Sequence, residues 1–287
     1  EKWTMEQWLD FDYRAGWGTE DFEDKVDAGK IKIKFPDAWA DTFDREDARA
    51  IIEENIVKLN EKKKHRLQVM ENGSRIDGPY FTSSLKAGSG LSFYYVVTNT
   101  DEGHNLPSGS LGAQPEIWLN VALVDPDGKN VWESGYVDQY GDMADLHSAD
   151  VRAGTLAHDG QLFNLQSKFL TTNIKGTERE MSLPINVDID QLPFLRPAPQ
   201  PTTVLNRTRF VRMEARSPPP LSIRKAKYRV PADTMSKPGK YKLAVRLRSR
   251  AEPIYFMKFV GATKEMEQAM NEWMIDIHPY AVEFEVK

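Results

Sequence analysis

A histidine on a turn-rich segment, His104, is the residue best placed to do chemistry in this sequence. It lies in V-T-N-T-D-E-G-H-N-L-P-S-G, residues 97–109, between a predicted strand that ends at Asn99 and another that begins at Glu116. Loops held between rigid strands are where binding and catalytic residues are usually found. An imidazole there can coordinate a metal ion, or it can hydrogen-bond the neighbouring backbone and fix the turn. The pattern leaves both roles open.

A second candidate site follows within residues 134–165, where carboxylates and histidines lie close together in the sequence. Its members are Asp138, Asp142, Asp145, His147, Asp150, His158 and Asp159. Aspartate and histidine bind divalent metal ions, and we take Asp142, Asp145 and His147 as the candidate ligands, with calcium as the candidate ion. The spacing matches no EF-hand loop, so a solvated acidic loop is the alternative.

Composition excludes several classes of function. Hydrophobic residues make up 40% of the 287, enough for a large core, and the net charge of −5 argues against a nucleic-acid-binding protein, which would present a basic face. No cysteine is present, which excludes disulfides, cysteine-ligated zinc, iron–sulfur clusters and covalent c-type haem on this chain. No apolar run reaches the roughly 20 residues that a membrane span needs.

The motifs of common enzymes are also missing. The sequence has no G-x-S-x-G, no H-E-x-x-H, no P-loop and no G-x-G-x-x-G, and it offers no cysteine nucleophile. Acidic residues are abundant, but abundance alone gives no paired-carboxylate geometry. We therefore predict a protein that is not an enzyme.

The elements that would position these residues begin with two unlike segments. Residues 1–43 form an acidic, irregular arm rich in aromatics, with one short helix at 4–11, and four of the aromatics are tryptophans: Trp3, Trp8, Trp17 and Trp39. Such an arm either wraps its own domain or lies on a partner subunit with the tryptophans as anchors. Residues 44–72 have apolar positions at helical spacing and end at Asn72-Gly73, which predicts one long helix.

From residue 73 the pattern changes to a period of two, which is typical of strands. Antiparallel strands are predicted at 81–86, 91–98, 116–124, 130–133, 224–230, 241–247 and 281–286, with short helices at 253–260 and 264–274 and a break at His278-Pro279. Short strands separated by turns indicate a β-sandwich. The predicted fold is mainly β: an antiparallel β-sandwich domain over 73–287, with loop and short-helix insertions, preceded by the arm and the long helix.

Two separated stretches resemble one family. The first is residues 97–109 together with E-I-W-L-N-V-A-L-V-D-P-D-G-K-N-V-W-E-S-G, and the second is Y-K-L-A-V-R-L-R-S-R-A-E-P-I-Y-F-M-K-F-V-G, residues 241–261. Together they resemble the C-terminal, haem-free β-sandwich region of bacterial multihaem c-type cytochromes, in which a segment V-x-N-x-G-A-G-H-x-x-P-T-G follows a long helix. Asp101 and Glu102 depart from the small residues usual there, and Ser108 replaces threonine.

The resemblance implies association with a cytochrome, because the C-x-x-C-H motif that attaches haem is absent. It implies a non-catalytic subunit or domain of a periplasmic or extracellular electron-transfer assembly, a hetero-oligomer in which this chain scaffolds and shields a multihaem c-type cytochrome. His104 would then be an axial ligand to haem c iron of the partner chain, or would pack on the haem edge. The alternative is a stand-alone cell-surface module for glycan or divalent metal, with Trp132 and Tyr136 as its aromatic platform.

Overall fold

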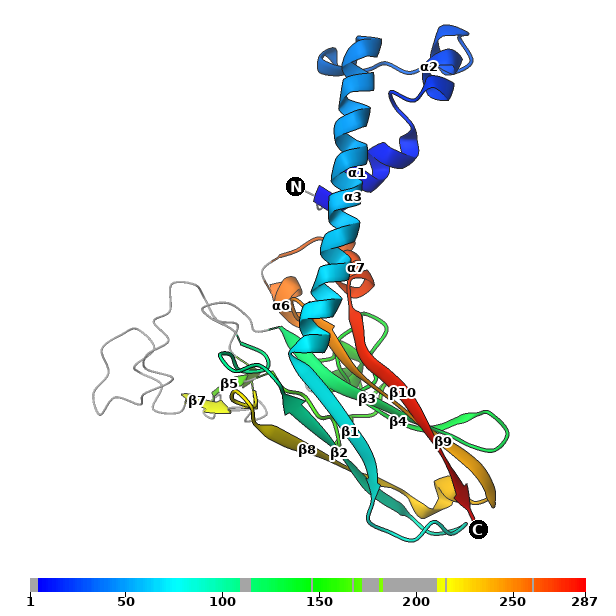
Figure 1. The fold of residues 1–287 in the computed structure, drawn as a ribbon, viewed down its shortest axis with the longest axis vertical. Helices are drawn as coiled ribbons and strands as arrows, with labels where there is room; N and C mark the ends of the chain where they lie inside the picture. The colour runs from blue at the N-terminus through cyan, green and yellow to red at the C-terminus, as the bar shows by residue number, and fades with distance from the viewer. Residues whose placement is uncertain are drawn as a thin grey trace, which may run out of the picture. The chain divides into compact units, whose positions relative to one another are not determined.

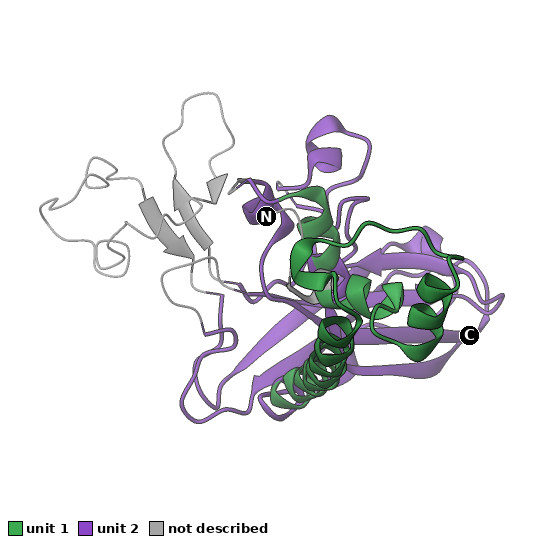
Figure 2. Ribbon diagram, turned by 90° about the horizontal axis from the view of Figure 1, so that it is seen from above, with its two compact units in different colours: residues 1–69, 263–269 green, residues 70–262, 270–287 purple. Residues whose placement is uncertain are grey.

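The computed structural model describes residues 5–108, 115–145, 147–166, 168–171, 181–182, 211–214, 216–259 and 261–287. Contacts divide the chain into two compact units, residues 1–69 with 263–269 (unit 1) and residues 70–262 with 270–287 (unit 2) (Figure 2). Within the described residues, no helix combines the length and the apolar character needed to cross a bilayer.

Unit 2 is built on two antiparallel sheets, which confirms the predicted mainly β fold (Figure 1). The first sheet has the order β1-β2-β8, with β1 at Ser74–Phe81, β2 at Leu91–Asn99 and β8 at Ile223–Val230. The second has the order β10-β9-β3-β4, with β10 at Ile275–Val286, β9 at Gly239–Arg250, β3 at Glu116–Val124 and β4 at Asn130–Ser134. A further sheet joins β6 (Met181–Ser182), β5 (Lys168–Thr171) and β7 (Val211–Glu214).

The core of unit 2 lies between the two main sheets. Alternate residues of β2, from Leu91 to Val97, are buried, as the period of two predicts. Aromatic rings join the sheets: the Phe81 and Phe284 ring centroids are 4.9 Å apart, and those of Phe93 and Trp132 are 6.1 Å apart. These contacts make the pair of sheets a sandwich with an aromatic core.

The last strand is longer than the sequence predicts. We expected His278-Pro279 to end a helix, but β10 begins at Ile275 and passes through this dipeptide as a bulge, with register lost between Ile277 and Tyr280. A bulge leaves a residue without a ladder partner, so it accommodates a proline that has no N–H. β10 is also an edge strand of its sheet, where proline is tolerated.

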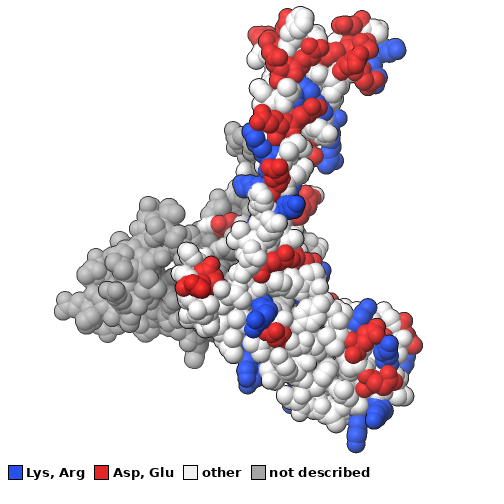
Figure 3. Space-filling view, in the orientation of Figure 1, with Lys and Arg blue, Asp and Glu red and all other residues white. Residues whose placement is uncertain are grey.

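Unit 1 is organised on the predicted long helix, α3, which runs over Thr42–Asn72. The arm before it contains α1 (Met5–Ala15), α2 (Glu20–Asp27) and a short 3-10 helix, η1 (Asp37–Trp39), where the sequence predicted one short helix. Thr19 accounts for the start of α2, because its side chain accepts a hydrogen bond from the N–H of Phe22 and acidic residues occupy the first turn. Acidic side chains are conspicuous around α2 and the start of α3 (Figure 3).

A buried ion pair holds the arm to the start of α3. The guanidinium of Arg45 pairs with the carboxylate of Glu23, and both side chains are buried. Arg45 also donates to the carbonyl oxygens of Trp39, at 2.7 Å, and Ala40, at 2.9 Å. The hydrogen bond from Arg45 holds the pKa of the Glu23 carboxyl below its ordinary value of 4.5.

We predict that unit 1 loosens on acidification because of this pair. A carboxyl whose pKa is lowered by folding contributes stability above its unfolded pKa, and that stability is lost as the pH falls through the folded pKa. The hydrogen-exchange protection factors of peptides covering residues 17–45, which are corrected for the slower intrinsic exchange at low pH, should therefore fall below pH 4.5. In Glu23→Gln this fall in protection should be absent, whereas Glu53→Gln, which removes the half-exposed partner of Arg49, should behave as the parent. An unchanged acid response in Glu23→Gln would contradict the prediction.

Candidate functional site

The loop that carries His104 begins where β2 ends, at a buried asparagine. The Asn99 side chain is fully buried, and its amide nitrogen donates to three carbonyl oxygens, those of His104 at 2.7 Å, Pro218 at 3.1 Å and Pro219 at 3.0 Å. Its Oδ1 accepts from the N–H of Asp101 at 3.0 Å. One side chain thus ties the loop to the segment that precedes β8.

Asp101 shapes the turn itself. Its Oδ1 accepts the backbone N–H of Gly103 at 2.7 Å and of His104 at 2.8 Å. These backbone hydrogen bonds hold the pKa of the Asp101 carboxyl below its ordinary value. The far end of the loop is anchored by Leu106, which is buried, donates its N–H to the carbonyl of Pro218 at 3.1 Å and precedes a cis peptide bond to Pro107.

The ring of His104 lies beside Asp101 and is exposed to solvent. The side chain is 72% exposed, and its Nδ1 lies 3.4 Å from Oδ1 of Asp101. A carboxylate beside Nδ1 favours the tautomer with the proton on that nitrogen, which leaves the Nε2 lone pair available to a metal. Backbone and Asx contacts fix the turn, so the imidazole is not needed for that purpose; ligation by His104 stays a prediction.

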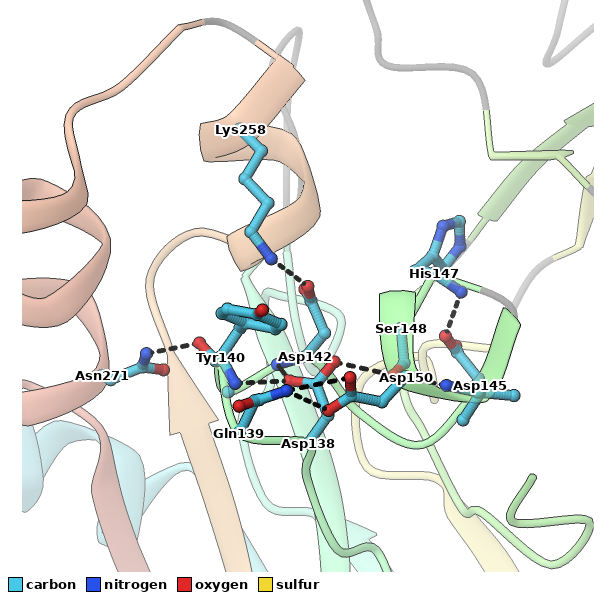
Figure 4. Close-up of polar contacts among 12 residues, drawn as sticks. Asp138, Gln139, Tyr140, Asp142, Asp145, His147, Ser148, Asp150, Lys258 and Asn271 are labelled. Atoms are coloured by element: carbon cyan, nitrogen blue, oxygen red, sulfur yellow. Dashed lines mark hydrogen bonds and ion pairs between the residues drawn. The ribbon is translucent and has the colours of Figure 1, made fainter. Parts of the chain in front are cut away.

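The acidic loop of residues 138–150 is held by its own side chains (Figure 4). Asp138 Oδ1 accepts the N–H of Tyr140 at 2.8 Å and of Asp142 at 2.9 Å, and its Oδ2 accepts the hydroxyl of Ser148 at 2.7 Å. Ser148 in turn caps the short helix α4, Ala149–Ala153. These hydrogen bonds fix the conformation of the loop.

The three candidate metal ligands of that loop make separate contacts (Figure 4). Asp142 is buried and accepts from Lys258 Nζ at 2.8 Å, and burial raises the pKa of its carboxyl despite that cation. Asp145 accepts the N–H of His147 at 2.8 Å, and the His147 ring stacks on Tyr255 with centroids 4.0 Å apart. In the part of the chain that the structure describes, no group of three or more His, Asp or Glu is arranged to hold a metal ion. The calcium prediction gains no geometric support.

The sequence pattern did not indicate a buried charge pair that lies near this loop. Arg250 at the end of β9 and Glu116 at the start of β3 are register partners, and both side chains are at most 1% exposed. The Arg250 guanidinium donates to Glu116 Oε2 at 3.0 Å, to the carbonyl of Gly141 at 2.7 Å and to Asn271 Oδ1 at 2.6 Å. Burial raises the pKa of the Glu116 carboxyl, and the Arg250 charge opposes that shift. The pair secures the acidic loop to the sandwich.

Only two of the four tryptophans predicted to bind a partner have side chains that the structure describes. Trp3 and the side chain of Trp8 lie outside the described residues. Trp17 and Trp39 are half-buried, with ring centroids 6.5 Å apart, and Trp17 also meets Phe35 edge to face at 5.0 Å. Their partly exposed rings form a small cluster in unit 1, and their contact with a partner stays a prediction.

The aromatic platform predicted for a glycan-binding module is not formed by Trp132. Its ring is partly buried and packs edge-on against Phe93 and Tyr228 of the facing sheet. Tyr136 donates its hydroxyl to the carbonyl of Ala157 at 2.8 Å. Trp132 was wrongly placed on the surface because strand β4 is short and gives little periodicity from which to choose its inward face.

Comparison with known proteins gives only weak structural likeness. No family model and no curated protein matches the chain. Among solved structures, it is similar to a penta-heme cytochrome c552 from Thermochromatium tepidum, with 13% sequence identity and a TM-score of 0.41 over 77% of this chain. The chain spans 42% of the length of that cytochrome. A likeness at this level carries no argument about function.

Proposed function

We propose that this chain is a non-catalytic subunit or domain of a periplasmic or extracellular electron-transfer assembly, where it scaffolds and shields a multihaem c-type cytochrome. The proposal rests on the resemblance of residues 97–109, 116–135 and 241–261 to the haem-free region of such cytochromes. The observation that carries it is the exposed imidazole of His104 on a loop fixed by Asn99 and Asp101.

The His104 loop fits a haem contact in three respects. Its ring is exposed, so iron held by a partner chain can reach Nε2 without rearrangement of the sandwich. Asp101 lies beside Nδ1, and a carboxylate in that position orients a ligating histidine. The Asn99 amide fixes the backbone at His104 itself, which lowers the entropy lost on binding. Haem iron supplies the redox centre, and an axial histidine helps to set its potential.

Unit 1 offers the contact surface for the same partner. Four apolar side chains of α3 are exposed: Phe43 by 75%, Ile51 by 60%, Val57 by 58% and Val69 by 67%. At about 100° of rotation per residue, these four positions fall within an arc of about 120° on one side of the helix. Ile52, on the opposite side, is buried. Apolar side chains on both sides suit a helix that packs on its own unit and on a partner.

The first test is assembly. The purified chain mixed with its multihaem cytochrome should co-elute in gel filtration, and Ile51→Lys with Val57→Lys should abolish co-elution because two charges would enter an apolar contact. Asn60→Lys, which adds a lysine at an exposed position of the same helix outside that arc, is the control and should still co-elute. Failure of the parent chain to co-elute would overturn the proposed association.

The second test concerns His104 alone. In the co-eluting complex, His104→Ala should convert one low-spin haem to high-spin iron in electron paramagnetic resonance, because an axial nitrogen is lost. His158→Ala, which removes another exposed histidine, should leave the spectrum unchanged. A complex that forms with His104→Ala and keeps its low-spin signal would refute ligation and retain the scaffolding role.

A further inference from the structure

A pocket of about 490 Å³ opens on unit 2 at the edge strand β8. Its size is within the range of small-molecule sites, roughly 300–1,000 Å³. It is lined by Thr82, Ser92, Phe93, Tyr94, Gln161, Lys225, Lys227, Tyr228 and Arg229. The lining contains three cationic residues and no carboxylate, although the chain as a whole carries a net charge of −5. The pocket is therefore positively charged on a protein that is negatively charged overall.

The three cations form a ladder along one face of β8. Lys225, Lys227 and Arg229 are exposed and alternate with the buried Ala226 and Tyr228. Alternate residues of a strand lie about 7 Å apart, so the outer two positions are separated by about 13 Å. Among the described residues, no ion pair neutralises any of the three. Their charges are thus available to an anion at regular intervals.

Neighbouring side chains contact two of these three residues, Arg229 and Lys225. Gln161 acts as a short strand partner: its Nε2 donates to the carbonyl of Arg229 at 3.0 Å, and its Oε1 accepts the N–H of Arg229. Lys225 Nζ lies 5.1 Å from the ring centroid of Tyr94, which stacks on Tyr80 at 5.0 Å. The Gln161 contacts therefore fix the backbone at Arg229, and the Tyr94 ring lies beside the Lys225 ammonium.

We propose that this pocket binds a small polyanion that carries two or three phosphate or carboxylate groups. Lys225 and Lys227 act as point charges for two of the groups, and the guanidinium of Arg229 grips another with paired hydrogen bonds. Lysines on an edge strand also discourage pairing with other sheets, but that role requires neither a concave surface nor the Gln161 contact with Arg229. The site is independent of His104 and of the cytochrome proposal.

The test uses inorganic tripolyphosphate and propane-1,2,3-tricarboxylate as separate probes in isothermal titration at low ionic strength. At least one probe should bind, and the better one identifies the source as phosphate or carboxylate. The variant Lys225→Gln/Lys227→Gln/Arg229→Gln should weaken that binding by about a hundredfold or more, because it loses three charge-assisted contacts. Lys129→Gln/Lys242→Gln/Lys287→Gln changes the net charge equally at exposed positions away from the pocket lining and should bind as the parent does.

A single substitution separates a built site from general attraction to positive charge. Arg229→Lys keeps the charge but removes the planar fork, so affinity should fall by about tenfold while the melting temperature of the free chain stays the same. Absence of binding by both probes would overturn the proposal. Equal weakening by the two triple variants would overturn it as well, because binding would then follow net charge alone.

Discussion

Replacing Arg250 by methionine should lower the free energy of unfolding of unit 2 by about 3–5 kcal/mol. Methionine fills much of the volume of the arginine stem but leaves the Glu116 carboxylate, 1% exposed, without its cation. It also removes the donors to the Gly141 carbonyl and to Asn271. Breaking a buried pair costs more than the pair is worth, because the remaining charge stays desolvated. Urea denaturation followed by circular dichroism measures the loss.

The size of this loss should depend on pH. In Arg250→Met, the pKa of Glu116 should rise further above its ordinary value of 4.5, because burial then acts without an opposing cation. A group whose pKa is raised by folding contributes stability below its unfolded pKa and loses it as the pH rises. The difference between parent and variant should therefore be smallest below pH 4.5 and should grow as the pH rises from 4.5 through the raised pKa of Glu116.

Two companion variants decide whether the buried charge is responsible. Arg246→Met removes a partly exposed arginine from the same strand, and it should cost no more than about 1 kcal/mol because its pair with Asp276 is in contact with solvent. Glu116→Gln combined with Arg250→Met should recover a substantial part of the loss by removing the stranded charge. Equal losses for Arg246→Met and Arg250→Met would refute the argument.

The fate of Arg250 illustrates what periodicity can and cannot predict. Along β9, Leu243, Val245 and Leu247 are buried as the alternation indicated. The same alternation places Arg250 on the outer face with the exposed Lys242. It is buried because Gly141, in the acidic loop, and Asn271 cover that end of the strand. Local pattern fixes the face of a strand, but only long-range contacts decide whether that face meets solvent.

The same distinction applies to the candidate sites. Strand ends, turn residues and the position of His104 on a loop followed from local sequence. The contacts of Asp142, Asp145 and His147 did not follow from local sequence. Proximity in sequence does not determine from which donors each carboxylate will accept hydrogen bonds. The polyanion pocket joins residues 82–94, Gln161 and residues 225–229. It became visible only when the register of β2 with β8 set Tyr94 opposite Lys227.

Asn99 is the residue on which the His104 loop most depends, and Asn99→Asp should destabilise unit 2 by about 3 kcal/mol or more. The substitution keeps the shape of the side chain but removes the amide that donates to the carbonyls of His104, Pro218 and Pro219. Among the described hydrogen bonds, the His104 carbonyl has no other donor. A carboxylate at a fully buried position would then face three carbonyl oxygens. Urea denaturation near neutral pH measures the effect.

Asn99→Ala and Asn105→Ala provide the scale for that effect. Alanine at position 99 removes the donor to the His104 carbonyl without adding a charge, so it should cost about 1–3 kcal/mol. Asn105 is exposed on the same loop, and its replacement should change stability by less than about 0.5 kcal/mol. The excess loss in Asn99→Asp should shrink on acidification, because protonation of the introduced carboxyl removes the charge and restores one donor.

Loss of the Asn99 amide should also distinguish the positioning of the His104 backbone from the ability of its ring to bind iron. The ring and Asp101 remain in Asn99→Ala, but the backbone at His104 is no longer held to the segment before β8. Amide relaxation measured by nuclear magnetic resonance should then show increased motion over residues 100–108. If His104 ligates a partner haem, the complex should dissociate faster while retaining its low-spin spectrum when formed, because the ligand is intact but must be ordered on binding. A loop as rigid as in the parent would show that Leu106 and Asp101 suffice to hold it, and that Asn99 is not its anchor.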